Sequence, residues 1–155
     1  MTTIKLIRLL QLFTYLIVVS QLAYYVFVMG DALKMVSIGN FVEQRKIVDP
    51  MVHQRHVPFY YAALILTLVM LIWHYKEWNS GIFMTTAFAL LCLIADVYLG
   101  LKENGPINTL VNQTAMGTPG IDWEGLRLKW ISLIKIRGMI SMAGFVSLLT
   151  GLIWK

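Results

Sequence analysis

The chain has 155 residues, of which 58% are hydrophobic and only 14% are charged, and its mean hydropathy is +0.69. A soluble domain carries about a quarter charged residues, so this composition excludes an ordinary soluble domain and indicates that much apolar surface faces lipid. The net charge of +5 does not indicate nucleic-acid binding, because the basic residues flank apolar runs, where Lys and Arg set membrane topology.

Four apolar runs follow one another along the chain, and each predicts a helix, because backbone polar groups in lipid must be satisfied internally. Crossing the hydrocarbon core takes roughly 20 residues, so flanking residues are included in each span. The predicted helices cover residues 6–30, 57–76, 81–101 and 131–154. The first is expected to be a retained helix, because its apolar part is longer than a signal-peptide core. The sequence therefore predicts an all-α polytopic membrane protein, a single domain (1–155) folded as an antiparallel four-helix transmembrane bundle.

Two of the three connections between these helices are long, about Gly30–His56 and Lys102–Lys129. In an antiparallel bundle both lie on the face opposite the two termini. That face carries nine of the 13 Lys and Arg residues, so the positive-inside rule places the long connections in the cytoplasm. The expected location is the bacterial inner membrane, with long connections and termini on opposite sides.

Ionisable side chains gather near the long-connection end of the bundle. Asp96 lies about five residues before the end of the third run, and Lys135 and Arg137 enter the fourth run on the same side. Such groups are costly at membrane depth, face the bundle interior and are functional candidates. Two interpretations stay open: an Asp96–Arg137 pair that only joins two helices, and a pair that forms the wall of a ligand pocket. Under the second, Asp96, Lys135 and Arg137 are the candidate catalytic residues.

The segment "HQRH" places His53 and His56 three residues apart, which on a helix puts both on one face and could hold a metal ion. Two histidines alone do not make a site, and Glu43, Asp49 or Asp96 would have to complete it. We therefore expect solvated histidines at the membrane interface and no cofactor, and His53 and His56 remain the candidate metal ligands.

The segment "GPINTLVNQ" predicts a turn followed by a short helix. Pro106 suits the first helical turn, and Asn104 or Asn108 could cap it by accepting from free backbone N–H groups. Alternatively, Asn108 and Asn112 share a helical face and project their amides into a pocket.

Three motifs combine into a pattern that can be compared with known families. "NFVEQRKIVDPM" has a leading Phe, a Gln and a Pro; "ENGPINTLVN" contains Asn-x-Pro-Ile-Asn; and "WISLIKIRG" has a Trp followed by an Arg. The matching positions are Phe41, Gln44, Pro50, Asn104, Pro106, Ile107, Asn108, Trp130 and Arg137. Together they resemble the anthrone oxygenase-like family of small four-helix membrane proteins, also described as a domain of unknown function. One departure is that the family often carries an Asn-His pair before the helix-four arginine, where this chain has Ile134 and Lys135.

The resemblance implies a pocket at the long-connection end, in which Asn104, Asn108 and Trp130 bind substrate beside Asp96 and Arg137. Some fungal and bacterial members of the family are linked to the oxygenation of anthrones without an obvious cofactor, and most members have no assigned activity.

Three function classes follow. The first is a cofactor-independent monooxygenase that acts on a lipophilic aromatic substrate. The second is a non-catalytic membrane subunit, lipid-binding protein or assembly protein. The third is a small-solute carrier, which with four helices would need to oligomerise. The expected partners are the lipid bilayer and a lipophilic small molecule, not nucleic acid; a homo-oligomer or a larger membrane complex stays open.

Overall fold

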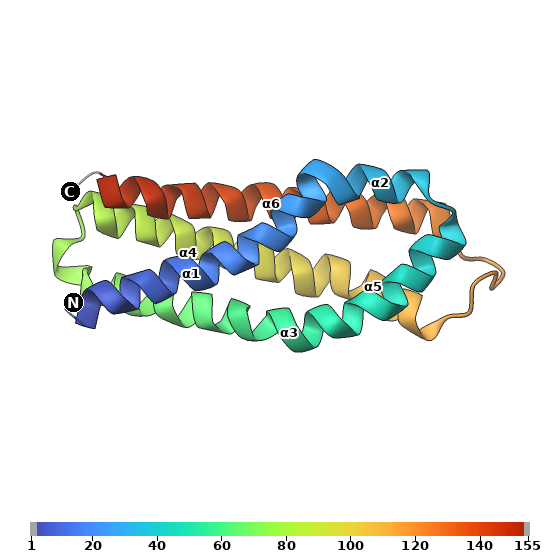
Figure 1. The fold of residues 1–155 in the computed structure, drawn as a ribbon, viewed down its shortest axis with the longest axis horizontal. Coiled ribbons are helices and arrows are strands. Elements are labelled where there is room, and N and C mark those ends of the chain that lie inside the picture. Colours follow the sequence, from blue (N-terminus) through green and yellow to red (C-terminus); the bar gives the residue numbers. More distant parts are fainter. Residues whose placement is uncertain (1–2, 154–155) are drawn as a thin grey trace.

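The computed structural model describes residues 3–153, which form helices and contain no β-strand. Four helical segments are long and apolar enough to cross a membrane: Thr3–Met35, Ile38–Trp73, Gly81–Gln113 and Trp123–Ile153. They alternate in direction, so the first begins and the last ends at the same end of the bundle (Figure 1). The predicted all-α four-helix transmembrane bundle is confirmed. Position 154 of the predicted helix 131–154 lies outside the described residues.

Each spanning segment is built from one to three elements. In chain order they are α1 (Thr3–Tyr24), the π-helical turn η1 (Tyr25–Met29), α2 (Gly30–Met35), α3 (Ile38–Trp73), the 3₁₀ turn η2 (Tyr75–Glu77), α4 (Gly81–Leu99), the π-helical turn η3 (Gly100–Asn104), α5 (Gly105–Gln113) and α6 (Trp123–Ile153).

The helices are longer than the sequence suggested, and most of the predicted long connections is helical. α3 begins at Ile38, not near residue 57, because the hydroxyl of Ser37 caps it by accepting from the backbone N–H of Asn40 at 3.3 Å. It then continues through Pro50 and Pro58. A proline inside a helix loses one backbone hydrogen bond, but packing against neighbouring helices can hold such a helix together. Similarly, α6 begins at Trp123 and not at residue 131.

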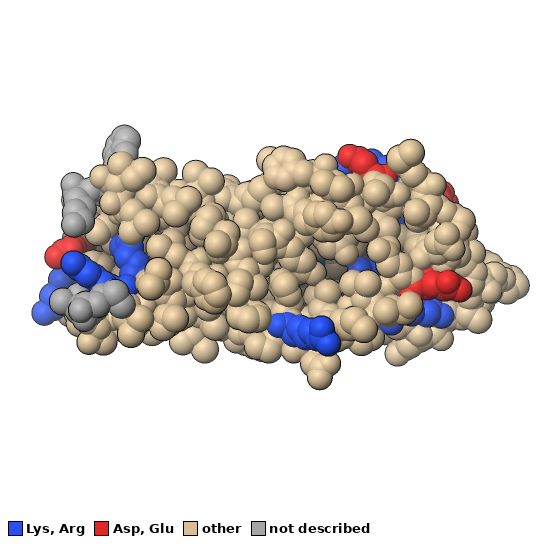
Figure 2. Space-filling view, viewed as in Figure 1, with Lys and Arg blue, Asp and Glu red and all other residues tan. Residues whose placement is uncertain are grey.

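These lengths make the bundle project beyond the bilayer. The 36 residues of α3 span about 54 Å at 1.5 Å per residue, whereas the hydrocarbon core is ~30 Å thick. Figure 2 shows Lys, Arg, Asp and Glu near both ends of the molecule and a band without charged residues between them. The end that joins α2 to α3 and α5 to α6 therefore stands out of the membrane as a helical extension.

The four helices occupy the corners of a square. α1 and α4 each pack against both α3 and α6, which places α1 and α4 diagonally opposite each other. In the middle of the bundle the hydroxyl of Tyr15 crosses this diagonal and donates to the carbonyl of Ala89 at 3.1 Å. Gly144 on α6 makes room for it, because a Cβ there would collide with the Tyr15 hydroxyl. This contact fills the space between the helices at the level of Tyr15, and the cavity described below lies nearer the projecting end.

Candidate functional site

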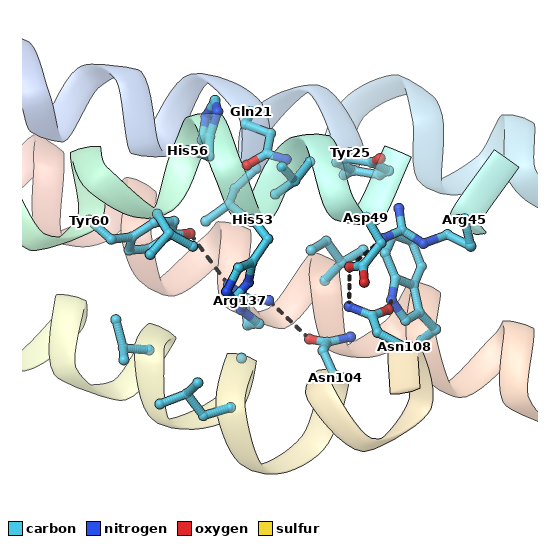
Figure 3. A pocket seen from close by; sticks show the side chains of 18 of the residues that line it. Gln21, Tyr25, Arg45, Asp49, His53, His56, Tyr60, Asn104, Asn108 and Arg137 are labelled. Carbon is cyan, nitrogen blue, oxygen red and sulfur yellow. Dashed lines mark hydrogen bonds and ion pairs between the residues drawn. The ribbon is translucent and has the colours of Figure 1, made fainter. Parts of the chain in front are cut away.

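A cavity of about 250 Å³ lies between the spanning segments, above Tyr15, where the apolar band meets the projecting end. Its wall is largely apolar, with polar side chains from all four segments (Figure 3). These polar or aromatic residues are Gln21, Tyr25, Arg45, Asp49, His53, His56, Tyr60, Tyr61, Asn104, Asn108, Trp130 and Arg137. A concave apolar site with a few converging polar groups is the usual form of a small-molecule site.

An ion pair between α4 and α6 stands behind one wall of this cavity. The Nε of Arg137 donates to Oδ1 of Asp96 at 2.6 Å, and the hydroxyl of Ser141 donates to Oδ2 at 2.9 Å. Asp96 is 0% exposed. The predicted approach of Asp96 to Arg137 is confirmed. Because both carboxylate oxygens are occupied and Asp96 is not part of the cavity lining, it orients Arg137 and does not face a ligand.

The guanidinium of Arg137 is held in one orientation by further contacts. Its Nη1 donates to Oδ1 of Asn104 at 3.2 Å, and its Nη2 donates to the hydroxyl of Tyr60 at 3.4 Å (Figure 3). It also lies over Gly100, where a Cβ would stand 3.0 Å from its Cζ. A guanidinium has five N–H donors, so two stay free beyond these three bonds. A preorganised cation in a largely apolar cavity can stabilise negative charge on an oxygen.

A second network closes the outer part of the cavity around Asp49. Its Oδ1 accepts from Arg45 at 3.2 Å and from Asn108 at 2.7 Å, and its Oδ2 accepts from Asn112 at 2.8 Å. Asn108 and Asn112 share a helical face as predicted, but only Asn108 lines the cavity, so the projection of both amides into a pocket is not confirmed. Oδ1 of Asn108 accepts from the indole N–H of Trp130 at 2.8 Å, and the Arg45 guanidinium lies 4.2 Å from a Trp130 ring centroid. The network fastens α3, α5 and α6 together.

The two histidines lie on α3 and both line the cavity. His53 is exposed, as expected of a rim position, and Nε2 of His56 lies 3.3 Å from the backbone carbonyl of Ile17. Within residues 3–153, no group of three or more His, Cys, Asp or Glu side chains is placed to hold a metal ion. Metal ligation by His53 and His56 stays a prediction.

Two of the predicted site residues make other contacts than expected, and a catalytic role of Lys135 stays a prediction. Lys135 lies outside the cavity, where its Nζ pairs with Asp31 at 2.8 Å on the protein surface. Positions two apart on a helix are separated by about 200°, so Lys135 must point away when Arg137 points inward. The side chain of Asn104 does not cap α5, because α5 continues directly from η3 and has no free N-terminus. The side-chain carbonyl of Asn104 instead accepts a hydrogen bond from Arg137. Pro106 in the first turn of α5 is confirmed.

Several lining residues were missed by the sequence analysis. Gln21 carries a signal that could have been used, because an amide inside an apolar run is as informative as a buried charge. Arg45 was assigned to a loop, and its contacts follow only once α3 is known to begin at Ile38. Tyr60 gives no signal, because an aromatic residue in an apolar run is ordinary.

Comparisons with protein-family models, with curated proteins and with solved structures found no match for this chain. The resemblance to the anthrone oxygenase-like family therefore stays a prediction from the motifs.

Proposed function

We propose that the protein binds a compact lipophilic aromatic molecule in this cavity and oxygenates it with dioxygen, without a bound cofactor. The observation that carries the proposal is the guanidinium of Arg137, which Asp96, Asn104 and Tyr60 hold against an apolar cavity. The resemblance to the anthrone oxygenase-like family supplies the reaction class. A shared fold does not by itself establish a reaction, so the chemistry must come from these side chains.

The proposed chemistry begins with loss of a proton from a ring methylene whose carbanion is conjugated with a carbonyl group of the same ring. The resulting negative charge is delocalised onto the carbonyl oxygen, where Arg137 stabilises it. The anion passes electrons to dioxygen and a carbon–oxygen bond forms, giving a hydroperoxide after protonation. Loss of water leaves a ketone, so CH₂ and O₂ become C=O and H₂O. His53 at the rim is the candidate proton acceptor, because both oxygens of Asp96 are already bonded.

The position of the cavity favours a ligand that arrives from the bilayer. Two lining residues on adjacent helices, Tyr61 on α3 and Leu101 on η3, are 63% and 68% exposed. Both lie in candidate membrane-spanning segments, Ile38–Trp73 and Gly81–Gln113, whose exposed apolar side chains face hydrocarbon tails. A lipophilic molecule can reach the cavity between these side chains without crossing water.

A second candidate is a non-catalytic ligand-binding or membrane-subunit role. The observation that favours it is the complete pairing of the carboxylates near the cavity. Asp96 is bonded by Arg137 and Ser141, and Asp49 is bonded by Arg45 and two asparagines. Such networks rigidify a fold and need no reaction.

We also propose a location. The projecting end carries most of the basic residues, which supports a cytoplasmic position under the positive-inside rule, and we propose that the membrane is the bacterial inner membrane.

Anthrone with ¹⁸O₂ tests the reaction in purified protein in lipid nanodiscs. We expect anthraquinone with one ¹⁸O atom to form faster than in protein-free nanodiscs, and Arg137→Gln to lower the rate about 100-fold. Arg55→Gln is the matched control, because Arg55 is exposed on α3 and does not line the cavity. Binding of anthrone without turnover would leave the non-catalytic ligand-binding role, and absence of binding would exclude the oxygenase and leave the membrane-subunit role.

A further inference from the structure

One polar side chain in the cavity is used neither by the ion pair nor by the Asp49 network. Gln21 lies on α1, and its amide points toward the cavity (Figure 3). Figure 3 draws no hydrogen bond from this amide to the other lining residues. An amide in a largely apolar wall is costly when it has no partner. Within residues 3–153 the Gln21 amide makes no hydrogen bond, so its donors and its acceptor can bind a ligand in the cavity.

A second free donor lies across the cavity. Asn104 is 2% exposed, and while its carbonyl accepts from Arg137, its Nδ2 has no hydrogen-bond partner among the described residues. Asn104 follows α4 on η3, and α4 stands diagonally opposite α1 in the bundle. The two incompletely paired amides therefore stand on opposite sides of one cavity, Asn104 together with Arg137 and Gln21 alone.

We infer that the ligand is polar at both ends: a flat aromatic molecule with oxygens on opposite edges, one held by Arg137 and Asn104 and the other by Gln21. This inference rests on the proposed function and names its substrate class. A cavity of ~150 Å³ holds a benzene ring, so the 250 Å³ here encloses about two fused rings, and the third ring of a molecule such as anthrone would extend into the opening between Tyr61 and Leu101. Leu22, Val97 and Ile134 supply apolar wall for the faces of such a ring system. Gln21 is a specificity-determining residue, since it selects ligands that carry the second oxygen.

Two naphthols make a matched pair of probes. 1,4-Dihydroxynaphthalene has an oxygen on each edge of one ring, whereas 1-naphthol lacks the second. Both are titrated into the full-length protein in nanodiscs under argon, where no oxygenation occurs, and their own fluorescence reports binding. Wild type is expected to bind the diol about fivefold more tightly, the factor of one hydrogen bond between neutral groups.

Gln21→Leu should abolish this fivefold preference while 1-naphthol still binds. Leucine suits a transmembrane helix, and retained binding of 1-naphthol itself reports an intact fold. Ser20→Ala is the control on the same helix, because Ser20 is exposed and bonds only the carbonyl of Ile17. Equal binding of both probes to wild type, or a preference that survives in Gln21→Leu, would overturn the inference and leave the proposed function standing. If neither probe binds wild type, the proposed function and this inference both fall.

Discussion

The guanidinium of Arg137 lies over the Cα of Gly100, so close that a Cβ there would stand 3.0 Å from Cζ and 3.0 Å from Nη2. Gly100 therefore helps to position the guanidinium of Arg137. Asp96 holds Arg137 from behind, Asn104 and Tyr60 hold it from the sides, and the missing Cβ leaves room for the guanidinium plane.

Gly100→Ala should move Arg137 and loosen its hydrogen bonds. Crowding of a packed site costs roughly 1–3 kcal/mol, partly offset by the better helix propensity of alanine. We expect a lower midpoint of thermal unfolding and at least tenfold weaker binding of 1-naphthol. The matched control is Gly39→Ala, where a Cβ would meet only Met116 at 3.8 Å, an ordinary contact. Equal behaviour of the two variants would show that Gly100 does not position Arg137.

Removing Asp96 should leave an unpaired buried cation. Asp96→Leu is expected to lower the free energy of unfolding by about 3–5 kcal/mol. The double variant Asp96→Leu with Arg137→Leu should recover most of that stability without recovering 1-naphthol binding. As a control, Glu103→Gln breaks an exposed pair with Lys129 at 3.3 Å and should cost less than about 1 kcal/mol. A double variant as unstable as the single one would contradict a role for charge pairing.

Lys135 should be dispensable for the cavity. Its ammonium pairs with Asp31, whose carboxylate also accepts from Lys34 at 2.9 Å, on the outside of the bundle. Lys135→Ala is expected to change anthrone oxygenation and 1-naphthol binding by less than twofold. Lys129→Ala serves as a second exposed lysine on α6. A loss above tenfold in Lys135→Ala alone would return this residue to the list of catalytic candidates.

The topology can be tested with single cysteines in a Cys92→Ala background, since Cys92 is buried and its replacement by alanine is small. Thr3→Cys at the start of α1 and Asn79→Cys between η2 and α4 lie at the same end of the bundle and should react with a membrane-impermeant maleimide added to intact bacterial cells. Ala115→Cys, between α5 and α6, should react only after the cells are opened. Labelling of Ala115→Cys from outside would reverse the proposed orientation, and labelling of all three from outside would refute the four-span bundle.

The long apolar runs were sufficient to predict four helices, because lipid allows the backbone few alternatives. They could not predict where the helices end outside the membrane. The second predicted helix begins at residue 57, next to Pro58, yet α3 begins at Ile38 and passes through Pro58. Only the packing of the projecting segments against one another decides this, and a single sequence does not show such packing.

The part of the candidate site that contains charged residues was predictable, because a charged side chain within a membrane span needs a partner. Asp96 and Arg137 were paired correctly, since each needs a partner of opposite charge. The Asp49 network was not foreseen, because Asp49 meets Asn108 and Asn112 across 59 and 63 residues of chain. The angle of about 200° between positions 135 and 137 on a helix predicts that Lys135 and Arg137 point in opposite directions. Looking for polar residues within the first apolar run would have identified Gln21.

The π turn at Gly100–Asn104 joins α4 and α5, the two halves of one spanning segment. Inserting or deleting a residue in this turn would affect the two halves differently. A π turn holds about one residue more than an α turn, and each residue of an α-helix advances the phase by about 100°. Deleting one residue within this turn would leave α4 and Asp96 in register with α6 but rotate α5, carrying Asn108 away from Asp49 and Trp130. Single-residue insertions and deletions at this point would thus remodel the outer wall of the cavity while sparing the membrane-embedded half.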